Sequence, residues 1–294
     1  MRMMDAFEDY LADNRGMYMS VITPGGNHGD TLIHMGLVKK LEEHRVQYRC
    51  INLETLYKKK PILGAQYLIN IGLWKLGKSQ GFKLIDLPEE TQLILFEGGG
   101  YMNDVWYGPV LLKQAIKNNS LPVTVAPQSY LFIHTRLHQY FEDGRQAYLF
   151  CREPYSLEHL KKKGLPSNVY TALSPELALY LTREDLKQFI EPREDGYQLL
   201  AFRHDKESAL EKTTKDEVTE ISDNPVVADI SMEKTMADFV SMVYNAQYVY
   251  TDRLHVAILS MILGKQVTLF GNRYHKNRGV WEYSLKDHVQ FVEV

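Results

Sequence analysis

The stretch QYVYTDRLHVAILSMILGKQVTLF, residues 247–270, decides the fold of this chain. Two short runs rich in β-branched and aromatic residues, at 247–251 and 266–270, predict strands. Their apolar residues are mostly continuous rather than alternating, which is typical of strands covered on both faces, as in parallel sheets. Between them, 256–263 is apolar nearly all round and predicts a buried central helix. The stretch therefore predicts a β-α-β unit in an α/β protein.

The same alternation of strand and helix extends outward along the chain. Further strand candidates lie at 17–23, 92–96, 122–126, 147–151, 198–203 and 225–229, with helical spacings of apolar residues between them. The 294 residues suffice for two domains of roughly 100–150 residues each. Ser174-Pro175 and the polar run at 191–196 punctuate the middle of the chain. We expect two Rossmann-like lobes with mainly parallel sheets, at 1–174 and 175–294, with the C-terminal segment packing back on the first lobe.

Composition narrows the classes of function. The formal net charge is −3, so no basic field favours nucleic acid as a main partner. Two cysteines argue against a disulfide framework and fit a reducing compartment. The N-terminus lacks the apolar core of a signal peptide, and the longest apolar run, Val256 to Leu263, is too short to span a bilayer. We expect a cytoplasmic protein that, if it works at a membrane, works from the cytoplasmic surface.

Unusual residues follow three of the predicted strands, where ligands bind in open α/β sheets. The turn at 24–30, PGGNHGD, is either a tight turn with Asp30 as helix cap or a ligand loop. Three glycines at 98–100 indicate either a ligand close to the backbone or close packing against a neighbouring loop. Arg152 is suited to bind a carboxylate or phosphate, or else to pair with Glu153 or Glu158.

The sharpest signal lies where strand 247–251 runs into the buried helix. With Thr251 or Asp252 as N-cap, Arg253 and His255 fall in the first turn, at the positive end of the helix dipole. A cationic pair works against the dipole there unless an anion is present, so the pattern predicts an anion site. The basic loop 272–279 either lines the same crevice or is a solvated loop. No CxxC, HExxH or DxD motif is present, which favours a metal-independent anion chemistry.

An ordered set of motifs then resembles the polysaccharide pyruvyl transferase family, from about residue 20 to 285. The motifs are Gly26-Asn27-x-Gly29-Asp30; Gly98 to Gly100; Arg152-x-x-x-Ser156 with Leu157, Leu160 and Gly164; and Arg253-Leu254-His255-x-x-Ile258 with Lys276 some twenty residues later. Each motif alone is weak, whereas their order and spacing together are fairly specific.

The resemblance implies a GT-B-like fold with an inter-lobe cleft, the first lobe serving the acceptor and the second the donor. It implies transfer of a pyruvyl group from phosphoenolpyruvate to two hydroxyls of a sugar, giving a cyclic ketal on an exopolysaccharide, a cell-wall polymer or a lipid-linked precursor. The reaction needs a general acid, and the resemblance gives that role, or protonation of the departing phosphate, to His255; it lets Asp30 orient or deprotonate the acceptor hydroxyl. The remaining roles are donor binding for Arg152, Arg253 and Lys276, and shaping of the acceptor cleft for Asn27, Gly29, Gly98, Gly99 and Gly100. Phosphoenolpyruvate is a co-substrate, and neither a metal nor another cofactor is expected.

The chain departs from the family pattern at two places. Pro175-Glu176 stands where the family often has Pro-Asp, and Ala126 to Ser129 replaces a glycine-rich segment. Two alternatives stay open: a nucleotide-sugar glycosyltransferase of the same fold, and a non-catalytic relative that binds a glycan. Association with the membrane surface is compatible with each of these functions.

Overall fold

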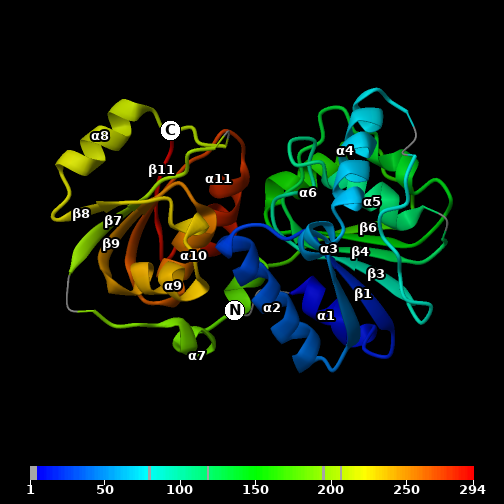
Figure 1. The fold of residues 1–294 in the computed structure, drawn as a ribbon, viewed down its shortest axis with the longest axis horizontal. Helices are drawn as coiled ribbons and strands as arrows, with labels where there is room; N and C mark the ends of the chain where they lie inside the picture. The colour runs from blue at the N-terminus through cyan, green and yellow to red at the C-terminus, as the bar shows by residue number, and fades with distance from the viewer. Residues whose placement is uncertain (1–4, 79–80, 118, 194–195, 206) are drawn as a thin grey trace. The chain divides into compact units, whose positions relative to one another are not determined.

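The computed structural model describes residues 5–78, 81–117, 119–193, 196–205 and 207–294. The chain forms two compact units (Figure 1), each built on its own sheet. Unit 1 comprises Met1–Gly26 and Leu37–Glu176, and unit 2 comprises Asn27–Gly36 and Leu177–Val294. The division falls two residues beyond the expected boundary, and 27–36 belongs to the second unit rather than the first.

Unit 1 contains a six-stranded parallel sheet in the order β2-β1-β3-β4-β5-β6. Its strands are β1 (Tyr18–Thr23), β2 (Gln47–Asn52), β3 (Leu93–Phe96), β4 (Val123–Gln128), β5 (Ala147–Cys151) and β6 (Val169–Leu173). Its helices are α1 (Ala6–Asp13), α3 (Leu53–Lys59), α4 (Pro61–Lys75), α5 (Gly108–Ile116), the 3-10 turn η1 (Leu137–Tyr140) and α6 (Pro154–Lys161). Figure 1 shows α4 and α5 on one side of this sheet and α1 on the other.

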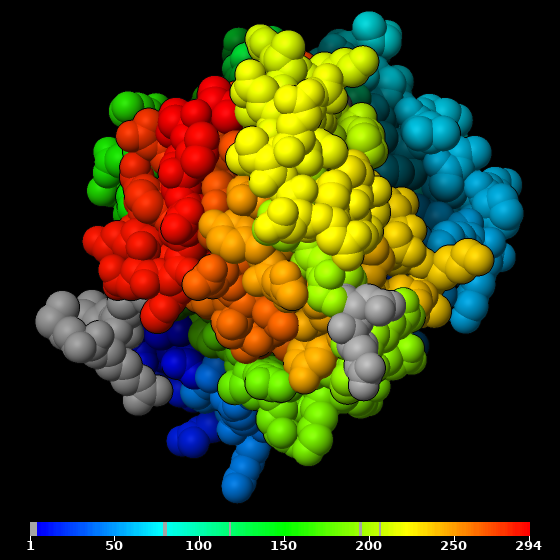
Figure 2. Space-filling model, turned by 90° about the vertical axis from the view of Figure 1, so that its left-hand side faces the viewer, coloured from blue at the N-terminus to red at the C-terminus, as the bar shows by residue number. Residues whose placement is uncertain are grey.

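Unit 2 contains a five-stranded parallel sheet in the order β11-β10-β9-β7-β8. Its strands are β7 (Tyr197–Ala201), β8 (Pro225–Val227), β9 (Ala246–Thr251), β10 (Gln266–Phe270) and β11 (Gln290–Val292). Its helices are α7 (Arg183–Leu186), α8 (Lys212–Glu220), α9 (Met236–Asn245), α10 (Leu254–Ile262) and α11 (Lys276–Val280). Shorter turns are η2 (Leu177–Tyr180), η3 (Lys187–Phe189), η4 (Ile230–Met232) and the π turn η5 (Trp281–Leu285). Figure 2 shows α8, in yellow, at the surface, where Val218 is its buried residue.

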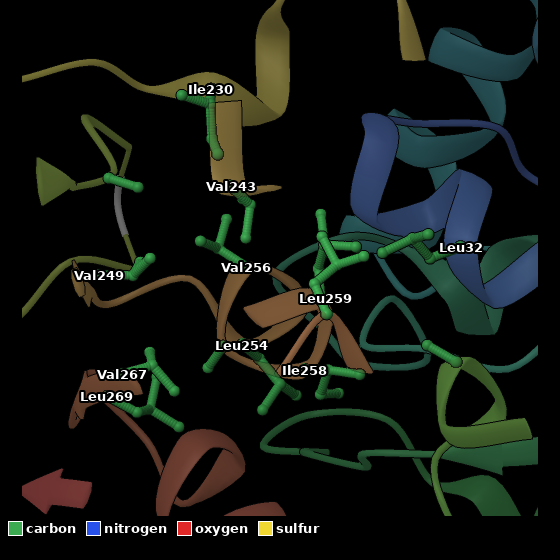
Figure 3. Close-up of a cluster of buried hydrophobic side chains, with 14 of the residues drawn as sticks. Leu32, Ile230, Val243, Val249, Leu254, Val256, Ile258, Leu259, Val267 and Leu269 are labelled. Carbon is green, nitrogen blue, oxygen red and sulfur yellow. The ribbon is translucent and has the colours of Figure 1, made fainter. Parts of the chain in front are cut away.

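Helix α10 is the centre of the unit 2 core, as its apolar sequence predicts. Val256, Ile258 and Leu259 are fully buried. Figure 3 shows these side chains clustered with residues of the neighbouring strands and helices, which include Val249, Val267, Leu269, Val243 and Leu32. Leu32 lies on α2 (His28–Glu43), whose first turns therefore pack in unit 2.

The α/β class and the parallel sheets are confirmed, and the differences lie at the sheet edges. Three strands escaped prediction, namely β2, β6 and β11, and each is an edge strand. The sequence of β2 mixes polar and apolar side chains, and all of them are exposed or half-buried, so it lacks the continuous apolar run of a central strand. The C-terminal segment forms β11 beside β10 in unit 2 and does not join the first unit. Among the helices in the described ranges, none is both long and apolar enough to cross a bilayer.

Candidate active site

The candidate site of unit 2 lies where its strand order changes direction. From β7 the chain proceeds to β8 on one side, whereas β9 pairs with β7 on the other. Ligands in open α/β sheets bind outside the carboxyl ends of strands at such a switch point. Arg203 follows β7, and Thr251, Asp252 and Arg253 end β9 and lead into α10. All four of these side chains are buried.

The N-cap of α10 is Arg253, with extended backbone at φ −97° and ψ 113°, so the prediction of Thr251 or Asp252 as cap is wrong. Thr251 Oγ1 accepts the Arg253 N–H at 2.9 Å and donates to the Ala201 carbonyl at 2.7 Å. The Asp252 carboxylate accepts the Arg203 N–H and the Ser208 hydroxyl, both at 2.8 Å. These side chains tie the strand ends together instead of capping the helix. The first turn of α10 consequently has no side-chain cap of its own.

Arg253 is held among carboxylates. Its Nη2 lies 2.5 Å from an Asp229 oxygen and 3.7 Å from an Asp205 oxygen. Its Nε is buried and has no hydrogen-bond partner among the described residues. A buried guanidinium donor without a partner is costly, and an incoming oxygen could satisfy it. The predicted cation therefore lies at the strand ends and retains one unused donor.

A second set of charges continues this network. Arg203 contacts Asp205 through Nε at 2.8 Å and Glu207 through Nη1 at 2.6 Å. Lys276, at the start of α11, also pairs with Glu207 and is buried. The structure thus brings Lys276 into the same network as Arg253, through carboxylates that the sequence analysis did not single out.

The carboxyls of this network have opposite pKa shifts. Burial raises the pKa of Asp252 above its ordinary value, against the lowering effect of its hydrogen bonds from Arg203 and Ser208. Burial also acts on Asp205, but the hydrogen bond from Arg203 and the nearby positive charges outweigh it and lower that pKa. The site therefore holds one carboxyl that protonates more readily than an ordinary aspartate and one that protonates less readily.

The first turn of α2 is closed by a reciprocal pair of hydrogen bonds. Asn27 is the N-cap: its Oδ1 accepts the Gly29 N–H at 2.8 Å. The Asn27 N–H donates in return to Asp30 Oδ2 at 2.9 Å, which is the arrangement of a capping box. Asp30 is therefore not the helix cap that the tight-turn alternative expects, because the helix begins at His28 and Asp30 is its third residue. The capping bond instead orients the Asp30 carboxylate.

Gly29 brings the first turn of α2 against His255. A Cβ added to Gly29 would lie 2.6 Å from His255 Nδ1 and 2.9 Å from His255 Cβ, closer than real contacts of that kind. Only glycine allows this approach of backbone to ring. His28 holds the same turn in place, because its Nε2 lies 2.8 Å from the Glu233 carbonyl and its ring stacks on Phe239. Two motifs from opposite ends of the sequence thus form one site in unit 2.

Arg152 is buried and paired with a carboxylate. Its guanidinium is buried, with Nη1 2.5 Å from Glu176, which is also buried, and Nε 2.8 Å from the Ser129 hydroxyl. The assignment of Arg152 to donor binding stays a prediction, and in this structure the charge of Arg152 is neutralised by Glu176 and shielded from solvent. Its partner is Glu176 at the end of unit 1, rather than Glu153 or Glu158.

The three glycines after β3 have a packing role. Gly98 and Gly99 are buried, and Gly99 lies at φ +122°, a region that favours glycine. The Gly99 N–H donates to the Pro127 carbonyl at 3.0 Å, and the Gly99 carbonyl accepts the Ser129 N–H at 2.9 Å. These bonds extend the pairing of β3 with β4. Of the three, only Gly100 is partly exposed, so the packing alternative accounts for the other two.

The match to known families covers most of the chain. A family model described as polysaccharide pyruvyl transferase matches residues 27–274, from the N-cap of α2 to the loop before α11. The chain belongs to the polysaccharide pyruvyl transferase family. This membership supports a general role in pyruvyl transfer to a sugar or polysaccharide acceptor.

Individual relatives of this family member are distant. The chain is 26% identical over 262 residues to General stress protein 30 of Bacillus subtilis, covering 77% of this chain and 71% of that protein. A crystal structure of a functionally uncharacterised protein from Klebsiella pneumoniae aligns with a TM-score of 0.66 at 21% identity, covering 98% and 97% of the two chains. A UDP-N-acetylglucosamine 2-epimerase aligns with a TM-score of 0.50 at 11% identity, covering 94% and 83%. These structural likenesses concern the fold, which is GT-B-like.

The chain also has a pocket in unit 1, of about 440 Å³. Its lining includes Pro24 after β1 and Leu53 and Glu54 after β2, and the strand order of that sheet changes direction at β1, which pairs with β2 on one side and β3 on the other. Four of its nine lining residues are aromatic and two are charged: Pro24, Leu53, Glu54, Tyr57, Lys58, Tyr67, Tyr101, Trp106 and Leu111. The Tyr57 hydroxyl is buried without a hydrogen-bond partner among the described residues, and burial raises its pKa to about 12. Aromatic faces with a few polar groups are suited to bind a sugar ring.

Several site residues of this family member escaped the sequence analysis although a signal existed for them. Arg203, Asp205 and Glu207 follow β7, and Asp229 follows β8. The rule that ligands bind beyond strand ends applies to these strands as it does to β9. Charged residues in a loop more often form a solvated surface, so the sequence alone does not distinguish these residues from such a surface. Their burial is visible only in the folded chain.

Proposed function

We propose that this chain transfers the pyruvyl group of phosphoenolpyruvate to two hydroxyls of one sugar and releases inorganic phosphate. The observation that carries the proposal is the approach of Gly29 to His255. Gly29 directly precedes Asp30, and His255 follows the buried cation Arg253 by two residues. This arrangement combines an imidazole that can donate or accept a proton, a carboxylate and an anion-binding group. Membership of the pyruvyl transferase family supports the same reaction class.

In the proposed donor complex, Arg253 and Lys276 bind the carboxylate and phosphate of phosphoenolpyruvate. Both cations are paired with carboxylates in the structure, Arg253 with Asp229 and Lys276 with Glu207. Phosphoenolpyruvate would then either displace these carboxylates from the two cations or bind the cations together with them. The unused Arg253 Nε supplies one donor without breaking an existing bond. Because the network already holds several carboxylates, binding of a further anion is expected to favour the protonated form of Asp252.

In the proposed reaction, two sugar hydroxyls add in turn to carbon 2 of phosphoenolpyruvate. His255 donates a proton to carbon 3 of the enol, and the first sugar hydroxyl forms a bond to carbon 2 as positive charge develops there. The bond from carbon 2 to the phosphate oxygen then breaks, and the second hydroxyl adds to the same carbon. Of the two hydroxyl protons, one restores His255 and the other leaves with phosphate. Asp30 would orient or deprotonate the hydroxyls. No oxidant or reductant takes part, so we propose no cofactor beyond this co-substrate.

For the acceptor we propose a sugar bound in the aromatic pocket of unit 1. Tyr57, Tyr67 and Trp106 offer ring faces, and the Glu54 carboxylate and Tyr57 hydroxyl can bind sugar hydroxyls. We place the reaction in the cytoplasm, where phosphoenolpyruvate is produced.

The test is turnover by a His255→Ala variant. Phosphate release from phosphoenolpyruvate is measured with a panel of sugar acceptors, and mass spectrometry detects ketal-linked pyruvate on the product. Loss of a general acid is expected to lower turnover on the order of 10²–10⁴-fold. His288→Ala, which changes an exposed histidine of the same unit, is the control and should keep full activity. An active His255→Ala enzyme would contradict the mechanism. Stabilisation of the wild type by UDP but not by phosphoenolpyruvate would favour a nucleotide-sugar transferase instead.

A further inference from the structure

Helix α4 exposes an apolar stripe to solvent. Ile62 is 69% exposed, Leu68 is 68% exposed, and Leu76, directly after the helix, is 71% exposed. Ala65, Ile69 and Gly72 are also exposed, so the exposed positions recur every three or four residues along one side. Between Lys60 and Lys75 the helix carries no charged side chain. A helix face directed at water is normally polar, so this stripe calls for a partner surface.

The opposite side of α4 is fixed against unit 1. Asn70 is buried and exchanges two hydrogen bonds with the backbone of Phe82, at 3.0 and 3.2 Å. Tyr67 stacks on Tyr57 with ring centroids 5.6 Å apart, and Trp74 meets Tyr107 edge-on at 6.0 Å. These contacts set the rotation of the helix. The apolar stripe is therefore held outward by the packing of the other face.

Lysines flank both ends of the stripe. From Leu53 to Lys78 the sequence contains five lysines and one acidic residue, Glu54, in a chain whose net charge is −3. Glu54 pairs with Lys58 at 2.6 Å. Lys59 and Lys60 are exposed, and no salt bridge involves them within the described residues. The surface around α4 is therefore locally positive, and its complement is a negatively charged surface that also accepts apolar side chains.

We propose that the apolar stripe of α4 and its flanking lysines dock on an anionic lipid bilayer. An interfacial helix inserts its apolar side chains at the headgroup boundary, while lysines at its ends bind lipid phosphates. A bilayer is favoured over a protein partner because the stripe itself offers no polar side chain for directional hydrogen bonds, whereas its charge lies entirely at its ends. Trp106, which is 39% exposed and lines the aromatic pocket together with Tyr67 of α4, is of the residue type that favours this boundary.

Docking would hold the aromatic pocket of unit 1 at the lipid surface. Tyr67 belongs both to α4 and to the pocket wall. This step rests on the proposed function, since it assigns the pocket to a sugar carried on a membrane lipid. The docking itself does not depend on catalysis and can be measured without any acceptor.

The experiment is co-sedimentation of the full chain with vesicles of phosphatidylcholine, with and without a minority of phosphatidylglycerol. The wild type is expected to bind the anionic vesicles, and to bind them less at high salt. Lys59→Gln with Lys60→Gln should weaken binding on the order of 20–30-fold, since each lysine near an anionic surface contributes about 5-fold. Ile62→Ser with Leu68→Ser should also release the chain from the vesicles.

Matched controls use the same chemistry elsewhere in unit 1. Lys161→Gln with Lys162→Gln changes the other lysine run, and Ile133→Ser changes a residue that is 66% exposed. Both should bind vesicles as the wild type does, and so should His255→Ala, which separates docking from catalysis. The proposal is overturned if the wild type does not bind, or if the controls weaken binding as much as the α4 variants. It is also overturned if the wild type self-associates without lipid and Ile62→Ser with Leu68→Ser abolishes that association.

Discussion

Gly29→Ala is the substitution that tests most directly whether the start of α2 and His255 form one catalytic unit. The added Cβ would lie 2.6 Å from His255 Nδ1, whereas an ordinary contact begins at 3.4 Å. The imidazole must therefore move by about 0.8 Å, or the helix turn must move by the same amount. The new Cβ would also lie 2.9 Å from Asn27 Oδ1, so the capping side chain has to shift as well.

The expected loss follows from the size of that displacement. Misplacement of a catalytic group by 1 Å lowers turnover by about 100-fold, which corresponds to about 2.7 kcal/mol of activation free energy. Stability should change much less, because alanine favours a helix over glycine by about 1 kcal/mol and offsets part of the overlap. The clash is with the movable side chains of His255 and Asn27, not with backbone. Gly29→Ala should therefore remain folded and bind phosphoenolpyruvate, yet turn over slowly.

Two other helix glycines provide matched controls. A Cβ at Gly72 would meet no atom within 4 Å, so Gly72→Ala should be slightly more stable and fully active. A Cβ at Gly36, on the same helix as Gly29, would lie 2.0 Å from the backbone carbonyl oxygen of Leu177, so Gly36→Ala should lose stability. Phosphate release, calorimetric binding of phosphoenolpyruvate and urea unfolding are measured on all three variants. Wild-type turnover by Gly29→Ala, or a loss of stability as large as that of Gly36→Ala, would refute the reasoning.

Three further predictions concern stability. Burial raises the pKa of Asp252, so the folded chain holds the proton of this carboxyl more tightly than the unfolded chain does. Asp252 therefore favours folding below about pH 4. This contribution to the free energy of unfolding declines as the pH rises through the folded pKa. Asn at position 252 can still accept the Arg203 N–H and can donate to the Ser208 hydroxyl, but it does not titrate. The free energy of unfolding of Asp252→Asn should therefore rise relative to that of the wild type as the pH increases. A difference in urea unfolding that does not depend on pH would contradict this. Arg152→Met should cost about 3–5 kcal/mol because it leaves Glu176 buried and uncompensated. Adding Glu176→Leu should restore part of that loss in a double-mutant cycle, whereas additive losses would exclude direct coupling. Thr235→Ala removes the side chain that caps α9 and should cost about 1 kcal/mol by urea unfolding, with activity retained.

The α/β class, the buried central helix and most core strands could be predicted because they depend on local patterns. A continuous apolar run such as 266–270 is buried on both faces wherever it is placed, so its sequence indicates a central parallel strand. The edge strand β2 could not be found in this way, because its exposed side chains carry no burial pattern. Its pairing with β1 depends on a neighbour that only the folded sheet provides.

In the candidate site, too, local features could be predicted from the sequence and long-range contacts could not. Arg253 and His255 were identified from their position alone, since a charged pair at the start of an apolar helix is a local anomaly. Arg152 was equally anomalous, yet it is neutralised inside unit 1 by Glu176, whose proximity is a long-range contact. The contact of Gly29 with His255 likewise joins residues from opposite ends of the chain.

The sequence by itself therefore determined the layers, the family and the helix on which the site is built. Only the tertiary structure decided which charges meet a partner and which side chains reach the site. Asp252 shows the reason: its carboxylate was a plausible helix cap by sequence, but β7 lies beside β9 and supplies the Arg203 N–H to it. Local sequence sets what a residue can bind, whereas the order of strands in the sheet determines which partner lies within reach.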